Sequence, residues 1–178
     1  MTTQTLIAGF GGQGVLFAGK FLAYKALLEG KQLSWLPSYG PEMRGGTANC
    51  AVIISDEPVS SPIVSHPDVL IAMNLPSLDK YEKEVAPGGM IFFDSTLIGR
   101  DVERTDVTVV RVPSTSLAQG MGAPTLANMV MTGKLISDCE AISDACVEDA
   151  LKKVVSARHA DLLDINLRAI KLGMEYRG

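Results

Sequence analysis

A glycine-rich segment near the start of the chain is the strongest chemical signal in the sequence. Residues 9–14 read Gly-Phe-Gly-Gly-Gln-Gly, a G-x-G-x-x-G pattern between an apolar run and a helical one. Glycines at such a turn let the backbone approach a phosphate closely, and free amide groups at a helix start attract an anion. The segment therefore predicts an anion or cofactor-phosphate contact formed by Gly9, Gly11, Gly12, Gln13 and Gly14.

A dinucleotide is not the ligand that this turn favours. A dinucleotide site also needs an acidic residue at the end of the second strand, where it holds the ribose. The second predicted strand covers residues 32–36 and is followed by Pro37, while Glu29 lies before it. Two interpretations stay open: the glycines only allow close packing of strand and helix, or the turn receives an anionic group from a larger cofactor or a partner-bound ligand.

Residues 37–46 form a second candidate segment. Two prolines and three glycines in these ten residues exclude a regular element. The planar guanidinium of Arg44 suits a phosphate or a carboxylate. Alternatively, Arg44 pairs with Glu42 and only orders the loop, an interaction that contributes less than about 1 kcal/mol. Asp94, at the end of a predicted strand, is either a crevice residue or a turn residue.

Composition narrows the classes of function. The chain has 178 residues, of which 47% are hydrophobic, and its formal net charge of −4 with no basic run argues against a nucleic-acid partner. It has neither an apolar stretch long enough to span a membrane nor a signal peptide, so we expect no membrane contact and a cytoplasmic location. Cys50, Cys139 and Cys146 form no CxxC pair, so we expect no metal held by this chain.

The order of predicted elements positions both candidate segments. Apolar strands alternate with helices, which predicts a three-layer α/β fold with a mostly parallel, doubly wound sheet and a helical C-terminal region. We expect one domain over residues 1–178, with the first strand central. The predicted strands cover residues 5–9, 32–36, 48–55, 69–73, 90–93 and 107–112, and the predicted helices cover 13–29, 78–85 and several segments of 115–176.

These motifs together resemble a known family. The blocks at residues 9–14, 38–46 and 67–74, followed by Pro113, Ala118 and Asn128-Met129, resemble the gamma subunit of 2-oxoacid:ferredoxin oxidoreductases. The resemblance extends over nearly the whole chain and is strongest to the 2-oxoglutarate type.

The resemblance implies one subunit of a multi-chain enzyme. Such enzymes decarboxylate a 2-oxoacid on thiamine diphosphate, pass electrons through iron–sulfur clusters to ferredoxin, and release an acyl-CoA. This chain has no GDG motif for thiamine diphosphate and magnesium, so those cofactors and the clusters are expected on alpha, beta and ferredoxin-like delta subunits. The chain alone is then inactive and carries no catalytic residue.

Coenzyme A and the partner subunits are the contacts that the resemblance suggests for the candidate residues. The glycine turn and Arg44 are the groups best suited to phosphates of coenzyme A. An alternative is a free-standing nucleotide-binding or regulatory α/β domain. The residues predicted at the subunit interface are Tyr39, Glu42, Arg44, Asn74 and Asn128.

Overall fold

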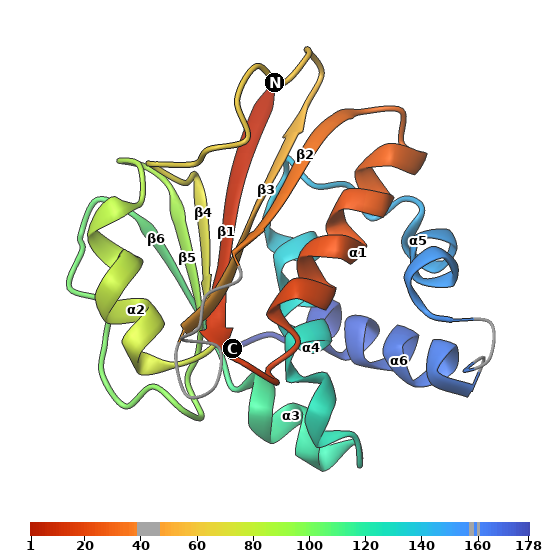
Figure 1. Cartoon of the computed structure of the whole chain (residues 1–178). Helices are drawn as coiled ribbons and strands as arrows, with labels where there is room; N and C mark the ends of the chain where they lie inside the picture. Colours follow the sequence, from red (N-terminus) through yellow and green to blue (C-terminus); the bar gives the residue numbers. More distant parts are fainter. Residues whose placement is uncertain (39–46, 157–158, 160) are drawn as a thin grey trace.

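One twisted sheet forms the centre of the molecule (Figure 1). The computed structural model describes residues 1–38, 47–156, 159 and 161–178. Within them the strand order is β2-β3-β1-β4-β5-β6, so the first strand is central, as predicted. The strands are β1 (Thr2–Phe10), β2 (Gln32–Ser38), β3 (Thr47–Ser55), β4 (Val69–Ala72), β5 (Met90–Asp94) and β6 (Thr108–Val112).

The sheet is parallel except for β3. Strands β1, β4, β5 and β6 pair in parallel, whereas β3 is antiparallel to both β1 and β2. The connection between β2 and β3 covers residues 39–46 and is too short for the crossover that parallel neighbours need. Because β1 and β2 both oppose β3, they point in the same direction and end at the same edge of the sheet.

Helices cover both faces of the sheet, which confirms the predicted three-layer α/β fold. Neighbouring residues of β1 face opposite layers: Ile7 belongs to the core shared with α1 and the C-terminal helices, and Leu6 to the core under α2. Figure 1 shows α2 alone on one side. The helices are α1 (Val15–Leu28), α2 (Leu75–Tyr81), α3 (Ser114–Gly120), α4 (Ala127–Asp138), α5 (Val147–Val154) and α6 (Asp161–Glu175), with short 3₁₀ turns η2 (Glu82–Glu84) and η3 (Pro124–Leu126).

Helix α2 begins three residues before its predicted start. The sequence interpretation placed the start at residue 78, and this was wrong. Asn74 is the N-cap, because its Oδ1 accepts a hydrogen bond from the Ser77 amide at 2.9 Å. Pro76 then lies in the first turn, where a proline loses no hydrogen bond.

Helices α4 and α6 touch backbone to backbone. A Cβ on Gly133 would lie 2.8 Å from the carbonyl carbon of Ile170, and one on Gly173 would lie 2.8 Å from that of Val130. The buried face of α6 consists of Asn166, Ala169, Ile170 and Gly173. Small residues therefore make the closest contact between α4 and α6.

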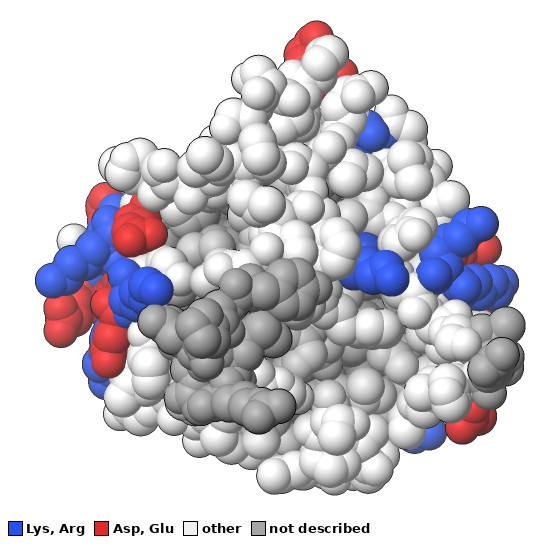
Figure 2. Space-filling view, viewed as in Figure 1, with Lys and Arg blue, Asp and Glu red and all other residues white. Residues whose placement is uncertain are grey.

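Charged groups are unevenly spread over the molecule. On the face shown in Figure 2 they gather over α2 at the left and over α5 at the right, and the described surface between, outside the residues drawn in grey, carries few charges. No helix in the described ranges is both long enough and apolar enough to cross a membrane.

Candidate functional site

The glycine turn lies between the end of β1 and the start of α1, at the carboxyl edge of the sheet. Gly12 and Gly14 both have left-handed backbone conformations, with φ of 94° and 71°. Gly14 is the N-cap of α1, and the Gln13 amide closes the turn by donating to the Phe10 carbonyl at 3.1 Å. These conformations explain why glycine stands at both positions, since other residues adopt them at a cost.

Three amide groups of the turn have no partner among the described residues. The structure shows no hydrogen bond from the amides of Gly11, Gly12 or Gly14 to another described residue. The first amides of α1 also have no partner within the helix and carry the positive end of its dipole. A hollow of about 250 Å³ adjoins these groups, and its walls are Phe10, Gly11, Gly12, Gly14, Val15, Leu16, Phe17 and Ala48.

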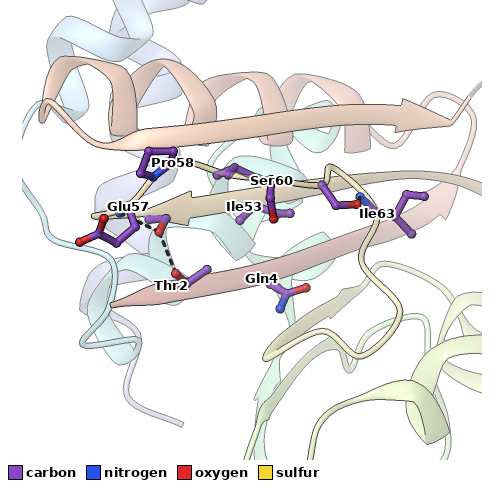
Figure 3. Close-up of a pocket in the computed structure, with 10 residues that line it drawn as sticks. Thr2, Gln4, Ile53, Glu57, Pro58, Ser60 and Ile63 are labelled. Atoms are coloured by element: carbon purple, nitrogen blue, oxygen red, sulfur yellow. Dashed lines mark hydrogen bonds between the residues drawn. The ribbon is translucent and has the colours of Figure 1, made fainter.

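A second hollow, of about 290 Å³, lies at the opposite end of β1 and β3 (Figure 3). Thr2 and Ser55 line it and share a hydroxyl hydrogen bond of 2.7 Å. Glu57 is the one carboxylate among its described lining residues. Ligands of parallel α/β sheets bind at the carboxyl ends of the strands, so the hollow beside the glycine turn is the better candidate.

Gln13 ties the turn to the end of β4. Its Oε1 accepts from the Phe10 amide at 2.7 Å and from Nδ2 of Asn74 at 3.3 Å, and its Nε2 donates to the Met73 carbonyl at 3.1 Å. Both ends of this side chain are thus engaged within the chain. In this structure Gln13 supports the turn rather than presenting its amide to an anion.

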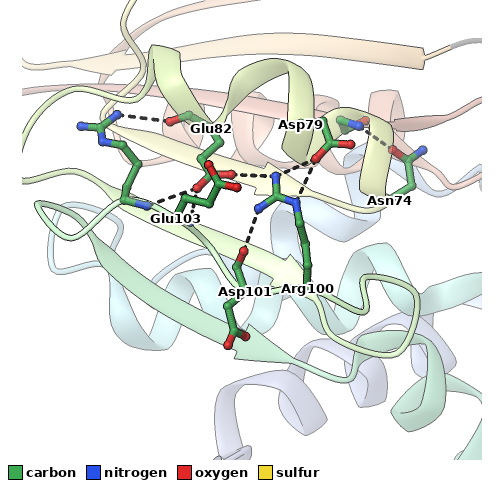
Figure 4. A network of polar contacts seen from close by, with 8 residues as sticks. Asn74, Asp79, Glu82, Arg100, Asp101 and Glu103 are labelled. Carbon is green, nitrogen blue, oxygen red and sulfur yellow. Dashed lines mark hydrogen bonds and ion pairs between the residues drawn. The ribbon is translucent and has the colours of Figure 1, made fainter.

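Asn74 joins the same network to α2. Its side chain is 3% exposed, and it caps α2 through Ser77 while its Nδ2 reaches Gln13. Figure 4 shows Asn74 at the start of α2, pointing toward the helix that it caps. The carboxyl ends of β1 and β4 and the start of α2 are therefore linked by side-chain amides.

Asn128, at the start of α4, holds the turn from the other side. Its Nδ2 donates to the Gly14 carbonyl at 3.0 Å, and its side chain is 4% exposed. A Cβ on Gly14 would lie 2.7 Å from the Asn128 Cγ, so the asparagine fills the space that this glycine leaves. Asn74 and Asn128 are therefore buried in the chain itself, and their predicted interface role stays a prediction.

The glycines of the motif separate into two kinds. A Cβ on Gly9 would lie 2.8 Å from Gln13 Oε1 and 2.9 Å from Met73 Cβ, so Gly9, like Gly14, permits close packing. Among the described residues, a Cβ on Gly12 would meet nothing within 4 Å. Gly12 therefore faces open space, and the packing interpretation of the motif does not account for it.

The second candidate segment contributes only its ends to the described structure. Tyr39, Glu42 and Arg44 lie outside the described residues. Ser38 pairs with Asn49 at the end of β2, and Thr47 pairs with Phe10 at the end of β1. The segment thus leaves and rejoins the sheet at the edge that carries the glycine turn.

Asp94 is a turn residue rather than a free crevice residue. Its carboxylate is fully buried, with Oδ1 accepting from the Thr96 amide at 3.0 Å. Oδ2 accepts from the Thr115 hydroxyl at 2.5 Å and from the Thr115 amide at 3.2 Å. Asp94 therefore joins the end of β5 to the start of α3.

A charged cluster over α2 was not predicted from the sequence (Figure 4). Arg100 donates to Asp79 and to Glu82, each at 2.7 Å, and Arg104 donates to the Val85 carbonyl at 2.9 Å. The Glu82 side chain is only 5% exposed. The sequence signal for this cluster was the spacing of its charges: Asp79 and Glu82 are three residues apart, across the end of α2, and Arg100 and Arg104 are four apart after β5. The cluster fastens the segment after β5 onto α2 and η2.

The cysteines do not form a metal site in the described ranges, where no cluster of three or more His, Cys, Asp or Glu side chains could hold an ion. Burial raises the pKa of the Cys50 thiol to about 12 and also raises the pKa of Cys139.

A family model described as pyruvate ferredoxin/flavodoxin oxidoreductase matches residues 4–176. The chain belongs to this family. The resemblance read from the sequence motifs is confirmed by this match and by the names of the relatives below.

Two relatives show how this family member compares with longer and shorter proteins. Ketoisovalerate oxidoreductase subunit VorA of Methanothermobacter thermautotrophicus is 42% identical over 171 residues, which are 96% of this chain and 35% of that protein. 2-Oxoglutarate synthase subunit KorC of Methanocaldococcus jannaschii is 36% identical over 154 residues, with 85% of this chain and 82% of that protein covered. The chain spans about a third of the length of the VorA relatives.

Solved structures share the fold. The gamma subunit of a keto/oxoacid ferredoxin oxidoreductase from Geobacter sulfurreducens has a TM-score of 0.83 at 28% identity, with 97% of this chain and 96% of that chain covered. The 2-oxoglutarate:ferredoxin oxidoreductase of Magnetococcus marinus, solved with 2-oxoglutarate, coenzyme A and succinyl-CoA bound, has a TM-score of 0.87 at 24% identity. That match covers 97% of this chain and 30% of the other, and it indicates a common fold alone.

Proposed function

We propose that the chain acts as the gamma component of a 2-oxoacid:ferredoxin oxidoreductase. The complex would oxidatively decarboxylate a 2-oxoacid, transfer the acyl group to coenzyme A and reduce ferredoxin. The family match over residues 4–176 supports this proposal. The observation that supports a specific role for this chain is the glycine turn beside a hollow. Its amides have no partner among the described residues, as expected of a site that binds an anion.

The redox and decarboxylation chemistry would reside on other chains. The sequence has neither a GDG motif for thiamine diphosphate and magnesium nor a CxxC pair for an iron–sulfur cluster. Alpha, beta and ferredoxin-like delta components would supply these cofactors, with ferredoxin as the electron acceptor. This chain would complete the assembly and help to enclose the site that receives coenzyme A.

Coenzyme A is the proposed ligand of the turn. Its phosphates need donors that approach without steric obstruction, and no described residue bonds the Gly12 amide or fills the space on its side-chain face. Arg44 follows β2 in the sequence and is the proposed second phosphate contact. Gly9, Gln13 and Gly14 would shape the turn rather than touch the ligand.

The substrate is proposed to be 2-oxoglutarate. Relatives named for 2-oxoglutarate and for ketoisovalerate both align with this chain, at 36% and 42% identity. An acyl-CoA assay of the native complex with 2-oxoglutarate, ketoisovalerate and pyruvate in turn would identify the substrate. The highest kcat/KM with 2-oxoglutarate is the expected result, and a higher value with ketoisovalerate would reassign the specificity.

Two matched glycine variants test the ligand contact. Gly12 and Gly30 both have positive φ and open space where a side chain would project, but Gly30 lies at the far end of α1. Gly12→Val in the assembled complex is expected to raise KM for coenzyme A at least about tenfold, which corresponds to about 1.4 kcal/mol. Gly30→Val carries a similar backbone strain and is expected to leave this KM unchanged.

Three outcomes would count against the proposal. Equal KM values for coenzyme A in the two variants would show that the turn serves only the packing of strand and helix. Ferredoxin reduction by the purified chain alone, with 2-oxoacid, thiamine diphosphate and coenzyme A supplied, would place the chemistry on this chain. Tight binding of a nucleotide by a chain that co-purifies with no partner would favour the free-standing nucleotide-binding alternative.

A further inference from the structure

Strand β2 is an unprotected edge of the sheet. It pairs with β3 on one side, and no strand among the described residues pairs with its other side. Its seven residues, Gln32–Ser38, include no charged side chain. Free edge strands are commonly protected by charged residues. The opposite edge strand, β6, follows this rule, because it contains Arg111, which forms an ion pair with Asp101.

Backbone alternation fixes which groups of β2 face outward. The Met73 amide donates to the Ala8 carbonyl at 2.8 Å, so the backbone groups of Ala8 face β4. Those of the preceding residue, Ile7, therefore face β3 and its partner Cys50. The backbone groups of the next residue in β3, Ala51, therefore face β2.

The same alternation leaves Leu33 and Trp35 with their N–H and C=O groups on the outer side. Ala51 faces its partner Leu36 in β2, so Leu36 points inward and its neighbours point outward. Pro37 also faces outward, where its missing N–H breaks no bond of the sheet. The edge thus offers two donors and two acceptors at successive outward positions, the set that an added antiparallel strand requires.

An apolar groove of about 260 Å³ runs beside this edge, on the α1 face of the sheet. Leu27 stands at its rim with 57% of its side chain exposed. Lys20 is the one charged residue in the described lining, and its Nζ lies 5.9 Å from the Tyr24 ring. The groove is lined by Lys20, Ala23, Tyr24, Leu27, Leu33 and Trp35.

We propose that β2 pairs with β2 of a second copy of this chain, about a two-fold axis at Ser34. In this register Leu33 of each copy faces Trp35 of the other, and each pair exchanges two backbone hydrogen bonds. The strand is self-complementary, since an aliphatic residue meets an aromatic one and no charge lies opposite a like charge. Pro37 takes no part in these four backbone hydrogen bonds between the two copies.

The charges beside the strand also complement one another in this arrangement. Helix α1 is antiparallel to β2, so Lys20 stands beside the carboxyl-terminal half of the strand and Glu29 follows the end of the helix. The two-fold axis reverses the second copy. Each Lys20 therefore lies nearer the carboxyl-terminal end of the other α1, where the negative end of the helix dipole lies, whereas Glu29 is held by Lys25 and Ser143 of its own chain.

This interface does not depend on the proposed function, because it would form in the purified chain without cofactors or other subunits. Sedimentation of the chain over a concentration series is expected to show a monomer–dimer equilibrium. Trp35 is the single tryptophan of the chain, so its fluorescence is expected to shift to longer wavelength in parallel with dissociation. A monomer at every concentration, including the case in which only another subunit occupies β2, would overturn the proposal.

Cysteine and lysine substitutions at the axis sharpen the test. In a Cys146→Ser background, Ser34→Cys places two thiols opposite each other at a non-hydrogen-bonded pair, and oxidised glutathione is expected to link the copies covalently. Val109→Cys in β6 is the matched control and is expected to stay unlinked. Ser34→Lys is expected to weaken dimerisation at least tenfold, with circular dichroism and Tm confirming the fold. Equal linking at Ser34 and Val109, or an unweakened Ser34→Lys dimer, would refute the pairing.

Discussion

The side-chain amide of Asn128 donates to the carbonyl oxygen of Gly14 at 3.0 Å, although 114 residues separate them in the sequence. This bond joins the first turn of α4 to the residue that caps α1. It does not occupy the amide groups of the turn, because it engages the carbonyl side of Gly14. The position of the proposed anion site therefore depends on a helix in the C-terminal half of the chain.

Loss of this bond is expected to affect both stability and ligand binding. Asn128→Ala leaves the Gly14 carbonyl without its side-chain donor, and we expect the free energy of unfolding to fall by about 1–2 kcal/mol. We also expect a higher KM for coenzyme A in the assembled complex, because the turn is held less firmly. Chemical denaturation and steady-state kinetics measure the two effects.

Asn166→Ala is the matched control for that variant. Asn166 is equally buried, at 4% exposure, and its Nδ2 donates to the Leu162 carbonyl at 2.7 Å within its own helix. A similar loss of stability with an unchanged KM is expected. If Asn166→Ala raised the KM as much as Asn128→Ala, the effect would come from general destabilisation.

Alanine at Gly14 is expected to be far more damaging than alanine at Gly12. Both positions have positive φ, which costs about 1–2 kcal/mol for other residues. At Gly14 the new Cβ also collides with the Asn128 amide, an overpacking that adds about 1–3 kcal/mol. In a double-mutant cycle measured by denaturation, Asn128→Ala should partly relieve Gly14→Ala; strictly additive losses would argue against the contact.

Gly133 and Gly173, where α4 and α6 touch, are expected to tolerate no larger residue. Gly133→Ala would push a methyl group into the Ile170 backbone, and backbone can move less readily than a side-chain tip. We expect a loss of at least about 2–3 kcal/mol, measured by thermal and chemical unfolding. Gly120→Ala has open space around its Cβ and should change stability little. Equal effects of the two variants would contradict the close packing of the helices.

The cysteines are expected to differ sharply in reactivity. Burial raises the pKa of Cys50 from 9.0 to about 12, so the native thiol stays protonated where an unfolded one ionises. Any stability that this shift contributes is therefore complete below pH 9 and is lost as the pH rises toward 12. Cys146 is half-buried, and iodoacetamide should label it first in native protein at pH 8. Rapid native labelling of Cys50 would show that its region opens easily.

Much of the fold could be predicted because its strands are short apolar runs bounded by turn residues. The run at 69–73 became β4 and that at 90–93 became β5, each with an error of one residue. The direction of β3 was not predicted, because apolar pattern carries no information on whether neighbours are parallel. The start of α2 was missed because both Asn74 and Ser77 are good N-cap residues and only their geometry separates them.

The position of the glycine turn in the fold was predicted from the sequence, whereas the contacts of its residues were not. The glycine turn lies where the motif indicated, between a central strand and a helix. The supporting role of Gln13 depends on Met73 and Asn74, about 60 residues away, and such contacts leave no trace in local pattern. The same applies to Asn128 and Gly14.

The reversed strand β3 also governs the order in which the sheet can assemble. β1 and β2 run in the same direction, but β3 occupies the position between them, so they form no backbone bonds with each other. After β1, α1 and β2 have formed, the position between β1 and β2 in the sheet is filled only when β3, which follows residues 39–46, pairs with both strands. Pairing of β3 with β2 is local, because only eight residues join the two strands, but pairing of β3 with β1 is non-local and forms late, because the chain loses entropy before contacts stabilise it. Folding should thus pass through a slow step in which β3 docks, and refolding is expected to be most sensitive to substitutions along that strand.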